Sequence, residues 1–441
     1  MPRDLPGFYF DPVKNRYFPL SSQPKSAKES ASAARSKQSN KAETQSSSSV
    51  VLKAKNGGSL YHSLQTARAA RNGRLRERAF RDIETCQLGE TSRCDTEAFI
   101  PYGRAKILAS CIAVYDRTVQ HVLGDSEGWV YERTPATTIS PPDTGIESPF
   151  AAEANLGSRI SSICTSGRQY IATSFGPSSN IMYGDWSTQK AVFITPTSQL
   201  VHDVWTSHFQ DRTLVLGMRK RAILYPDIEY SHTHHKLPTG SDVLAVHRLQ
   251  TMVYTGSRNG SVHRFDTREP TPSGLALLDD RFCEGSNSIV YLNAVDEWQL
   301  VVGSVRGNIE LFDLRFPRGS RPMLSLHGQP SGHQLDLPHA ISPCNKYIFA
   351  AGIDSRIRGW SLLTGQPLGP TPSSTSSPIP MFSSLSSDNN GPVRANPFRV
   401  NFDDCILTSL QVVEIGHQTC LYATSGHRLF RFFLGQQYIG S

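Results

Sequence analysis

Two stretches of the sequence, GSRNGSVHRFDTR at residues 256–268 and GSVRGNIELFDLR at residues 303–315, are copies of one another. Glycine, serine, a second glycine, a β-branched residue, phenylalanine, aspartate and arginine stand at identical offsets, and the copies begin 47 residues apart. A polar turn followed by a strand that ends in an aromatic residue is typical of one unit in a repeated β-structure. The copy therefore predicts a chain built from repeated β-sheet units.

Further copies extend the repeat over most of the chain. A looser one stands at residues 351–361 (AGIDSRIRGWS), where tryptophan replaces the phenylalanine. The same order of polar turn, strand and aromatic residue recurs at residues 124–132, 178–186, 217–227 and 425–433. The aromatic residues that mark the copies are Tyr131, Tyr183, Tyr225, Phe265, Phe312, Trp360 and Phe432. These marks predict seven units.

A single unit of this kind is a small sheet that cannot bury both of its faces, so the units must stack, and a ring of stacked sheets solves that problem. A four-stranded unit of about 40–50 residues that ends in an aromatic–aspartate pair resembles the WD40 repeat. The resemblance implies an all-β fold, a seven-bladed WD40 β-propeller over residues 96–441. A β-sandwich also has many short strands, but it would not predict copies with coincident Gly, Phe, Asp and Arg.

Two segments between the marks are unusually rich in proline and serine, at residues 134–150 and 366–400. We expect both to be disordered loop insertions, which a propeller tolerates because they leave the blade. The chain ends soon after the seventh mark, so we expect the last blade to take its outer strand from elsewhere. Residues near Glu97 to Tyr102 are the candidate, and their pairing would close the ring and remove an exposed sheet edge.

The N-terminus holds a cluster of aromatic residues within residues 1–20. The cluster comprises Phe8, Tyr9, Phe10, Tyr17 and Phe18. Two short strands around Pro12 to Asn15 could pair as a hairpin, which is marginal alone in water, so the aromatic residues indicate a docking motif. Its docking surface is either this chain's own propeller or a partner. Residues 21–58 are Ser-rich and poor in apolar residues, which predicts a disordered linker.

Residues 59–85 are rich in helix formers and precede the repeats. Asn72-Gly73 splits the segment, so we expect two short helices joined by a turn. In the second, Leu75, Ala79 and Ile83 follow one another at four-residue spacing with Phe80 beside them, which predicts an apolar stripe. Helices this short are marginal alone, so the stripe needs a surface to lie on.

Charge is unevenly distributed along the chain. Residues 1–85 hold 16 Lys and Arg against 7 Asp and Glu, whereas the rest holds 29 against 31. The basic arm is compatible with nucleic acid or an acidic protein surface, but it has no recognised nucleic-acid module, so nucleic acid is not the expected partner. No apolar run is long enough to span a membrane. The eight scattered cysteines suit a reducing compartment, so we expect an intracellular protein of the nucleus or cytoplasm.

A search for catalytic chemistry finds no phosphate-binding loop, dinucleotide fingerprint, HExxH or GxSxG pattern in the sequence. His232, His234 and His235 lie together, but no cysteine or carboxylate stands at a spacing that would complete a zinc site. We therefore expect a polar loop there, no metal, no cofactor and no enzymatic activity.

Two consecutive repeats end in an aromatic–Asp–x–Arg box, which supplies Asp266, Arg268, Asp313 and Arg315. Tandem boxes of this form resemble those of propeller proteins that serve as substrate receptors of cullin-4 RING ubiquitin ligases. The resemblance implies that the arginines contact the ligase's propeller adaptor, the large subunit of damaged-DNA-binding protein, with help from a helical segment before the propeller. The boxes here have Phe in place of Trp, and the next repeat, Trp360 to Leu363, lacks both Asp and Arg.

The N-terminal run LPGFYFDPVKNRYFPL narrows the resemblance, because it is similar to the motif that opens members of the WD repeat protein 21 family, also called cullin-4-associated factor 4. The resemblance implies a monomeric propeller that presents a protein substrate for ubiquitination. Two alternatives remain open at this point. In the first, the arginines simply pair with nearby carboxylates. In the second, the chain is a general WD40 scaffold in another complex, for example in RNA or chromatin processing.

Overall fold

The computed structural model describes residues 8–11, 16–19, 73–99, 105–115, 118–133, 150–196, 200–230, 233–269, 272–278, 287–316, 321–369, 396–402 and 406–435. The chain divides into two compact units, residues 1–55 and residues 56–441. The greater part of both expected insertions, at 134–149 and 370–395, lies outside the described residues, as do the linker and the expected first helix. No helix in the part of the chain that is described is long and apolar enough to cross a membrane.

The first unit contains a hairpin of two short strands, β1 (Phe8–Asp11) and β2 (Arg16–Pro19). The strands are antiparallel, and their register pairs Tyr9 with Phe18 and Phe10 with Tyr17. This is the pairing that the sequence predicts. The side chains of the five aromatic residues lie outside the description, so their docking role stays a prediction.

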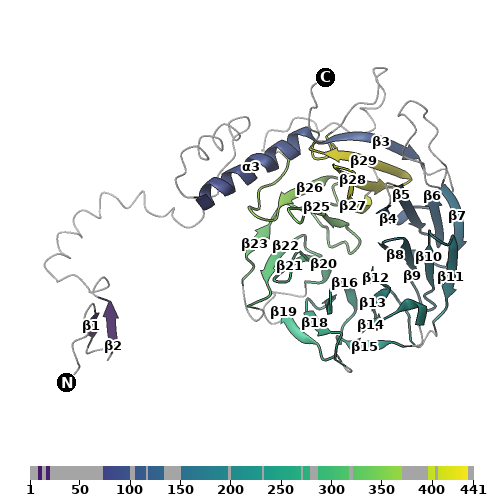
Figure 1. The fold of residues 1–441 in the computed structure, drawn as a ribbon, viewed down its shortest axis with the longest axis horizontal. Coiled ribbons are helices and arrows are strands. Elements are labelled where there is room, and N and C mark those ends of the chain that lie inside the picture. The colour runs from purple at the N-terminus through teal and green to yellow at the C-terminus, as the bar shows by residue number, and fades with distance from the viewer. Residues whose placement is uncertain are drawn as a thin grey trace, which may run out of the picture. The chain divides into compact units, whose positions relative to one another are not determined.

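The second unit is a ring of seven sheets, as predicted (Figure 1). We number the blades in chain order. Blade 1 is β4 (Ile107–Tyr115), β5 (Thr118–Asp125), β6 (Trp129–Arg133) and β7 (Phe150–Asn155); blade 2 is β8 (Ile160–Ser166), β9 (Gln169–Ser174), β10 (Ile181–Asp185) and β11 (Lys190–Ile194); blade 3 is β12 (Thr206–Gln210), β13 (Thr213–Met218), β14 (Arg221–Tyr225) and β15 (His235–Pro238). Blade 4 is β16 (Val243–Leu249), β17 (Met252–Ser257), β18 (Val262–Asp266) and β19 (Leu275–Leu278); blade 5 is β20 (Ile289–Ala294), β21 (Gln299–Ser304), β22 (Ile309–Asp313) and β23 (Leu324–Leu326); blade 6 is β24 (His339–Ile341), β25 (Tyr347–Ala351) and β26 (Ile357–Ser361). Blade 7 is β27 (Leu407–Ile415), β28 (Gln418–Ser425), β29 (Arg428–Leu434) and β3 (Arg93–Phe99).

The core lies between the blades, where the aromatic marks of the sequence fill the space. Phe265 of blade 4 is fully buried and packs in one cluster with Val215 and Leu224 of blade 3. Trp360 of blade 6 packs in the same way with Val301 of blade 5. Phe265 and Trp360 therefore each tie their blade to the one before it, and burial of large apolar surface between neighbouring blades stabilises the ring.

The strand register shows which marks are equivalent. Tyr225, Phe265, Phe312 and Trp360 all pair with the second residue of the neighbouring strand in their blades. In blade 2 that position is Gly184, so the mark at Tyr183 is one residue out of register. Tyr131 also pairs at another position, whereas Phe432 pairs with Leu421, four residues before the end of its neighbouring strand, as Phe265 and Phe312 do with Val253 and Leu300. The repeat is therefore regular in blades 3 to 7 and has diverged in blades 1 and 2.

Blade 7 shows how the ring closes. Its outer strand is β3, which precedes the propeller in the sequence and pairs antiparallel with β29 near the end of the chain. The strand begins at Arg93, earlier than the predicted start near Glu97. The pairing confirms the predicted closure, and it leaves β29 with a hydrogen-bonded strand on each side.

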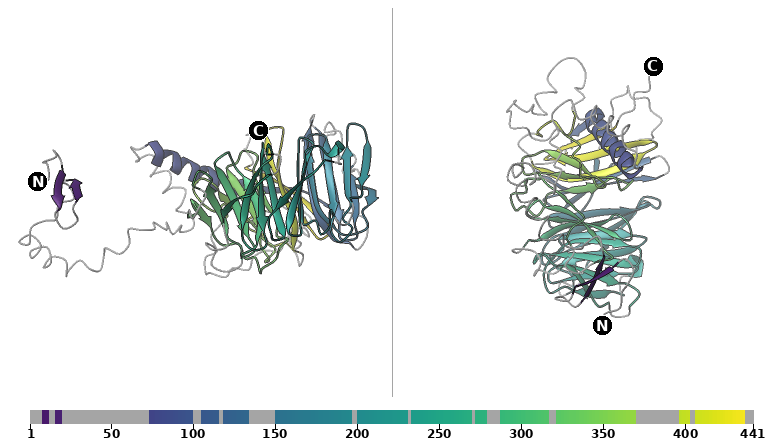
Figure 2. Two further views of the ribbon diagram at one scale, coloured as in Figure 1. Left: turned by 90° about the horizontal axis from the view of Figure 1, so that it is seen from below. Right: turned by 90° about the vertical axis from the view of Figure 1, so that its left-hand side faces the viewer.

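Two faces of the ring are distinguished by their turns. The third strand of each blade ends at one face of the ring, which we call the box face. The name refers to the two Asp–x–Arg boxes, because β18 ends at Asp266 and β22 ends at Asp313. The turns between first and second strands lie at this same end. We call the opposite end the turn face, because the turns between second and third strands lie there. Figure 2 shows the blades edge-on, with the two faces on opposite sides of the disc.

One α-helix, α3 (Gly73–Thr91), is found among the described residues. It begins at the predicted break but continues past the expected end at Thr85 and leads directly into β3. Figure 1 shows it outside the ring, beside blades 6 and 7. Within the predicted stripe Ala79 and Ile83 are buried, whereas Phe80 is 46% exposed. The side chain of Leu75 lies outside the description.

Candidate interaction surface

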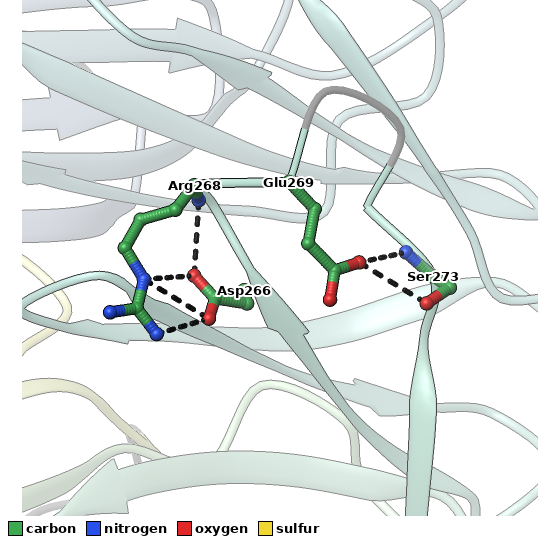
Figure 3. A network of polar contacts seen from close by, with 4 residues as sticks. All are labelled: Asp266, Arg268, Glu269 and Ser273. Carbon is green, nitrogen blue, oxygen red and sulfur yellow. Dashed lines mark hydrogen bonds and ion pairs between the residues drawn. The ribbon is translucent and has the colours of Figure 1, made fainter.

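The box of blade 4 is a short turn that directs one arginine outwards. The Arg268 side chain folds back on Asp266, to which Nε donates at 2.9 and 3.1 Å and Nη2 at 2.5 Å (Figure 3). The Arg268 backbone N–H also donates to the same carboxylate at 3.0 Å. These bonds lower the pKa of Asp266 to about 2, so the pair is charged at neutral pH.

The box of blade 5 repeats this geometry. Arg315 donates to Asp313 from Nε at 2.9 and 3.1 Å, from Nη2 at 2.5 Å and from its backbone N–H at 3.0 Å. Hydrogen bonds from Arg315 lower the pKa of Asp313 below its usual range. The side chains of Arg268 and Arg315 are 68% and 56% exposed, so both guanidinium groups face solvent in the same local conformation.

The backbone of each box is fixed by the neighbouring turn of its own blade. The Thr267 N–H donates to the Thr251 carbonyl at 2.9 Å, and the Leu314 N–H donates to the Trp298 carbonyl at 2.7 Å. Leu314 is buried in the cluster between blades 4 and 5. The arginines are therefore presented by two turns of fixed backbone on adjacent blades, both on the box face.

This arrangement suits protein binding. A guanidinium presents a planar set of N–H donors. In each box, the guanidinium groups that donate to the aspartate are Nε and Nη2. The outer edge is left to donate to a carboxylate or carbonyl of a partner. The pairing that the sequence left open as an alternative is thus present, and it holds the arginine rather than covering it.

Apolar side chains flank the second box. Trp298 is 53% exposed on the turn before β21, and Phe316 is 67% exposed directly after Arg315. The neighbouring Asp296 accepts a hydrogen bond from the Trp298 N–H and raises the pKa of Arg315 further, after the larger effect of Asp313. Exposed aromatic residues beside an arginine are typical of interface anchors. The sequence does not single out either aromatic residue, because neither falls on the repeat and only solvent exposure distinguishes them.

The helix α3 reaches the same face at blade 6. The pKa of Asp82 is raised by burial and lowered in part by a hydrogen bond with Thr364, which follows β26 at the box end. Thr85 is hydrogen-bonded to Tyr347 at the start of β25. Phe80 and Arg76, whose guanidinium lies 5.6 Å from the Phe80 ring centroid, are exposed on α3. The part of α3 around Asp82 and Thr85 therefore lies against the box end of blade 6.

The other sequence predictions have less structural content. Within the histidine cluster, His232 lies outside the described residues. The part of the chain that the structure describes contains no group of three or more His, Cys, Asp or Glu side chains placed to hold a metal ion. Leu363, which occupies the arginine position of the box in blade 6, is exposed. The boxes of blades 4 and 5 thus carry the charged part of the surface.

Comparison with solved structures shows the fold. The chain is similar to the crystal structure of the WD40 β-propeller domain of Doa1, with a TM-score of 0.53 and 12% sequence identity over 77% of this chain and 96% of that one. It is also similar to the computationally designed Ika8 protein, with a TM-score of 0.45 and 15% identity over 76% and 98%. No protein-family model and no curated protein matches the sequence. The first likeness identifies a WD40 β-propeller.

Proposed function

We propose that this WD40 propeller is a non-enzymatic substrate receptor that docks through its box face on the propeller adaptor of a cullin-4 RING ubiquitin ligase. The observation that carries the proposal is the pair of exposed arginines, Arg268 and Arg315, held in one conformation on adjacent blades. The WD40 fold, typical of interaction scaffolds, supports the general role. The resemblance of the boxes and of the N-terminal motif to those of such receptors supports the specific partner.

The geometry of the boxes is suited to this docking. An isolated arginine loses much rotamer freedom when it binds, and that loss weakens an interface. Here the aspartate of each box already orients the guanidinium, so less freedom remains to be lost. Trp298 and Phe316 supply apolar area beside Arg315, which allows water to be excluded around the charged contact.

The helix extends the same surface. Its exposed Phe80 and Arg76 lie on a helix that is anchored to the box end of blade 6 through Asp82 and Thr85. An aromatic residue on a helix face is a common anchor for a groove of a partner. We therefore assign α3 and the two boxes to one docking surface, with the turn face left for a substrate.

The test is the affinity of the purified full chain for the purified adaptor, measured by isothermal titration calorimetry. We expect the double variant Arg268→Ala, Arg315→Ala to bind about tenfold or more weakly, the loss typical of central interface arginines. Arg268→Lys, Arg315→Lys keeps both charges but loses the planar fork, so we expect an intermediate affinity.

The matched control is Arg258→Ala, which removes another carboxylate-paired arginine, from the turn face. All variants should keep the thermal midpoint of the parent chain, which separates binding from folding. Equal affinity of the double variant and the parent would contradict the docking role of the boxes. Failure of the parent chain to bind the adaptor would reject this ligase and favour a scaffold in another complex.

A further inference from the structure

A pocket opens on the turn face of blade 3, away from the boxes. It has a volume of about 510 Å³ and is lined by His202, Arg219, Lys220, Arg221, Lys236 and Pro238. Arg219 and Lys220 form the turn between β13 and β14, and Lys236 lies on the outer strand β15. Four of the six lining residues carry a positive charge at neutral pH, and none of the six is acidic.

The positive charge of the pocket is not balanced by nearby carboxylates. Arg219, Lys220 and Lys236 make no ion pair with any residue that the structure describes. Asp242 accepts the Lys220 backbone N–H at 3.3 Å, but its carboxylate is ion-paired with Arg258 at 3.1 Å. Because the Asp242 carboxylate pairs with Arg258, it does not neutralise Arg219, Lys220 or Lys236, and these three side chains can interact with an anionic ligand.

Two further groups give the pocket a defined wall. Nη2 of Arg221 donates to the Leu200 carbonyl at 3.2 Å, which holds this side chain against the segment before blade 3. Nδ1 of His202 is buried and has no hydrogen-bond partner among the residues described. A buried polar atom without a partner costs stability, and a ligand oxygen that accepts from Nδ1–H would supply one.

We propose that this pocket binds the phosphorylated side chain of a peptide segment. A phosphoryl group carries about −1.5 to −2 charges at neutral pH and three acceptor oxygens, which matches several unpaired cations better than a single carboxylate does. The volume is that of a site for one side chain and its neighbours. The assignment of this peptide to a ubiquitination substrate rests on the proposed function, whereas the binding itself does not.

The surroundings favour a peptide over a nucleic acid. A nucleic-acid strand presents phosphates at regular spacing and needs a track of available cations. On the turn face beyond blade 3, Arg258 is paired with Asp242, and Arg356 and Arg358 are paired with Asp354. In blades 4 and 6 these arginines are balanced by carboxylates, whereas the blade 3 pocket gathers four basic side chains in one place, which fits a single anionic group.

The experiment measures binding of the full chain to an immobilised peptide library with a fixed central phosphoserine and degenerate flanks, beside its unphosphorylated counterpart. We expect binding to the phosphorylated library, competition by inorganic phosphate, and at least tenfold weaker binding by the double variant Lys220→Glu, Lys236→Glu. The matched control Lys190→Glu makes the same charge change at an exposed lysine of β11, outside the pocket, and should bind like the parent.

Single-stranded RNA and vesicles that contain phosphoinositides are tested in parallel. Preference of the parent chain for either of them over the phosphopeptides would overturn the proposal, as would no binding to the library or equal binding by the double variant. A thermal midpoint equal to that of the parent shows that the variants are folded. Adaptor affinity, measured on the same variants, should not change, so failure of the docking proposal and failure of this one are distinguishable.

Discussion

At the scale of single residues, the sequence located the charged part of the candidate surface but not its setting. Asp266, Arg268, Asp313 and Arg315 were found because they repeat at one offset in two copies. The aspartates orient the arginines through the short turn that follows each third strand. This turn depends only on residues close in sequence, so both copies of the repeat form it. The exposed Trp298 could not be found, because its exposure is set by neighbours distant in the sequence.

Buried histidines give a residue-scale prediction for pH dependence. Burial lowers the pKa of His121 and of His208 to about 3 and that of His247 and of His339 to about 4, with the charge of Arg133 acting second on His121. In the unfolded chain the pKa of each of these groups is near the ordinary histidine value of 6.5. Below that value only the unfolded state gains protons, so stability is present above pH 6.5 and falls as the pH is lowered towards 4.

Each such histidine lowers the free energy of unfolding by up to about 1.4 kcal/mol per pH unit in this window. We expect urea denaturation to show a clearly lower stability at about pH 5 than at about pH 7.5. His121→Gln keeps a polar partner for Ser110, whose hydroxyl lies 2.8 Å from the His121 ring, and should reduce the pH slope. An unchanged slope in this variant would show that His121 is not protonated on unfolding.

At the scale of elements, the sequence predicted a helix before the propeller and its break at Gly73, because both depend on local propensity and spacing. The length and the docking of α3 were not predictable. They follow from contacts with residues hundreds of positions away, such as the bond of 2.6 Å from Asn396 Nδ2 to the Gly89 carbonyl and the ion pair of Glu90 with Arg399. The helix lies where blade 6 has only three described strands.

Gly89 is where this docking is closest, and it gives an element-scale prediction. A Cβ at Gly89 would lie 1.6 Å from the Leu368 carbonyl oxygen, whereas a Cβ at Gly73 meets nothing within 4 Å. Alanine is favoured over glycine in a helix by up to about 1 kcal/mol, so Gly73→Ala should be neutral or stabilising. Gly89→Ala should instead lower the free energy of unfolding by about 1–3 kcal/mol, as overpacking does. Chemical denaturation checks both, and a stabilised Gly89→Ala chain would show that α3 does not pack rigidly on blade 6.

At the scale of the whole molecule, the repeat was sufficient to predict seven blades and their closure. The copies in blades 3 to 7 keep the aromatic residue in one register, and the apolar contact that it makes between blades explains why. Blades 1 and 2 have diverged at that position, so their marks at Tyr131 and Tyr183 predicted the number of blades but not the register. The gathering of four basic side chains in the blade 3 pocket appears only after folding.

Ring closure by β3 leads to a prediction about truncation. Deletion of residues 1–55 removes a separate compact unit, and deletion of residues 1–72 keeps both α3 and β3, so neither should lower the thermal midpoint of the propeller. Deletion of residues 1–92 removes the helix and leaves β3, and any decrease in the thermal midpoint then measures the contribution of α3 docking.

Deletion of residues 1–99 also removes β3, which exposes the edge of β29. An unpaired strand edge promotes aggregation, so we expect the midpoint to fall by about 5 °C or more beyond the 1–92 chain and light scattering to rise on heating. If the 1–99 deletion melts like the 1–92 deletion, β3 does not hold the ring closed and the stability of the propeller comes from stacking of the blades alone.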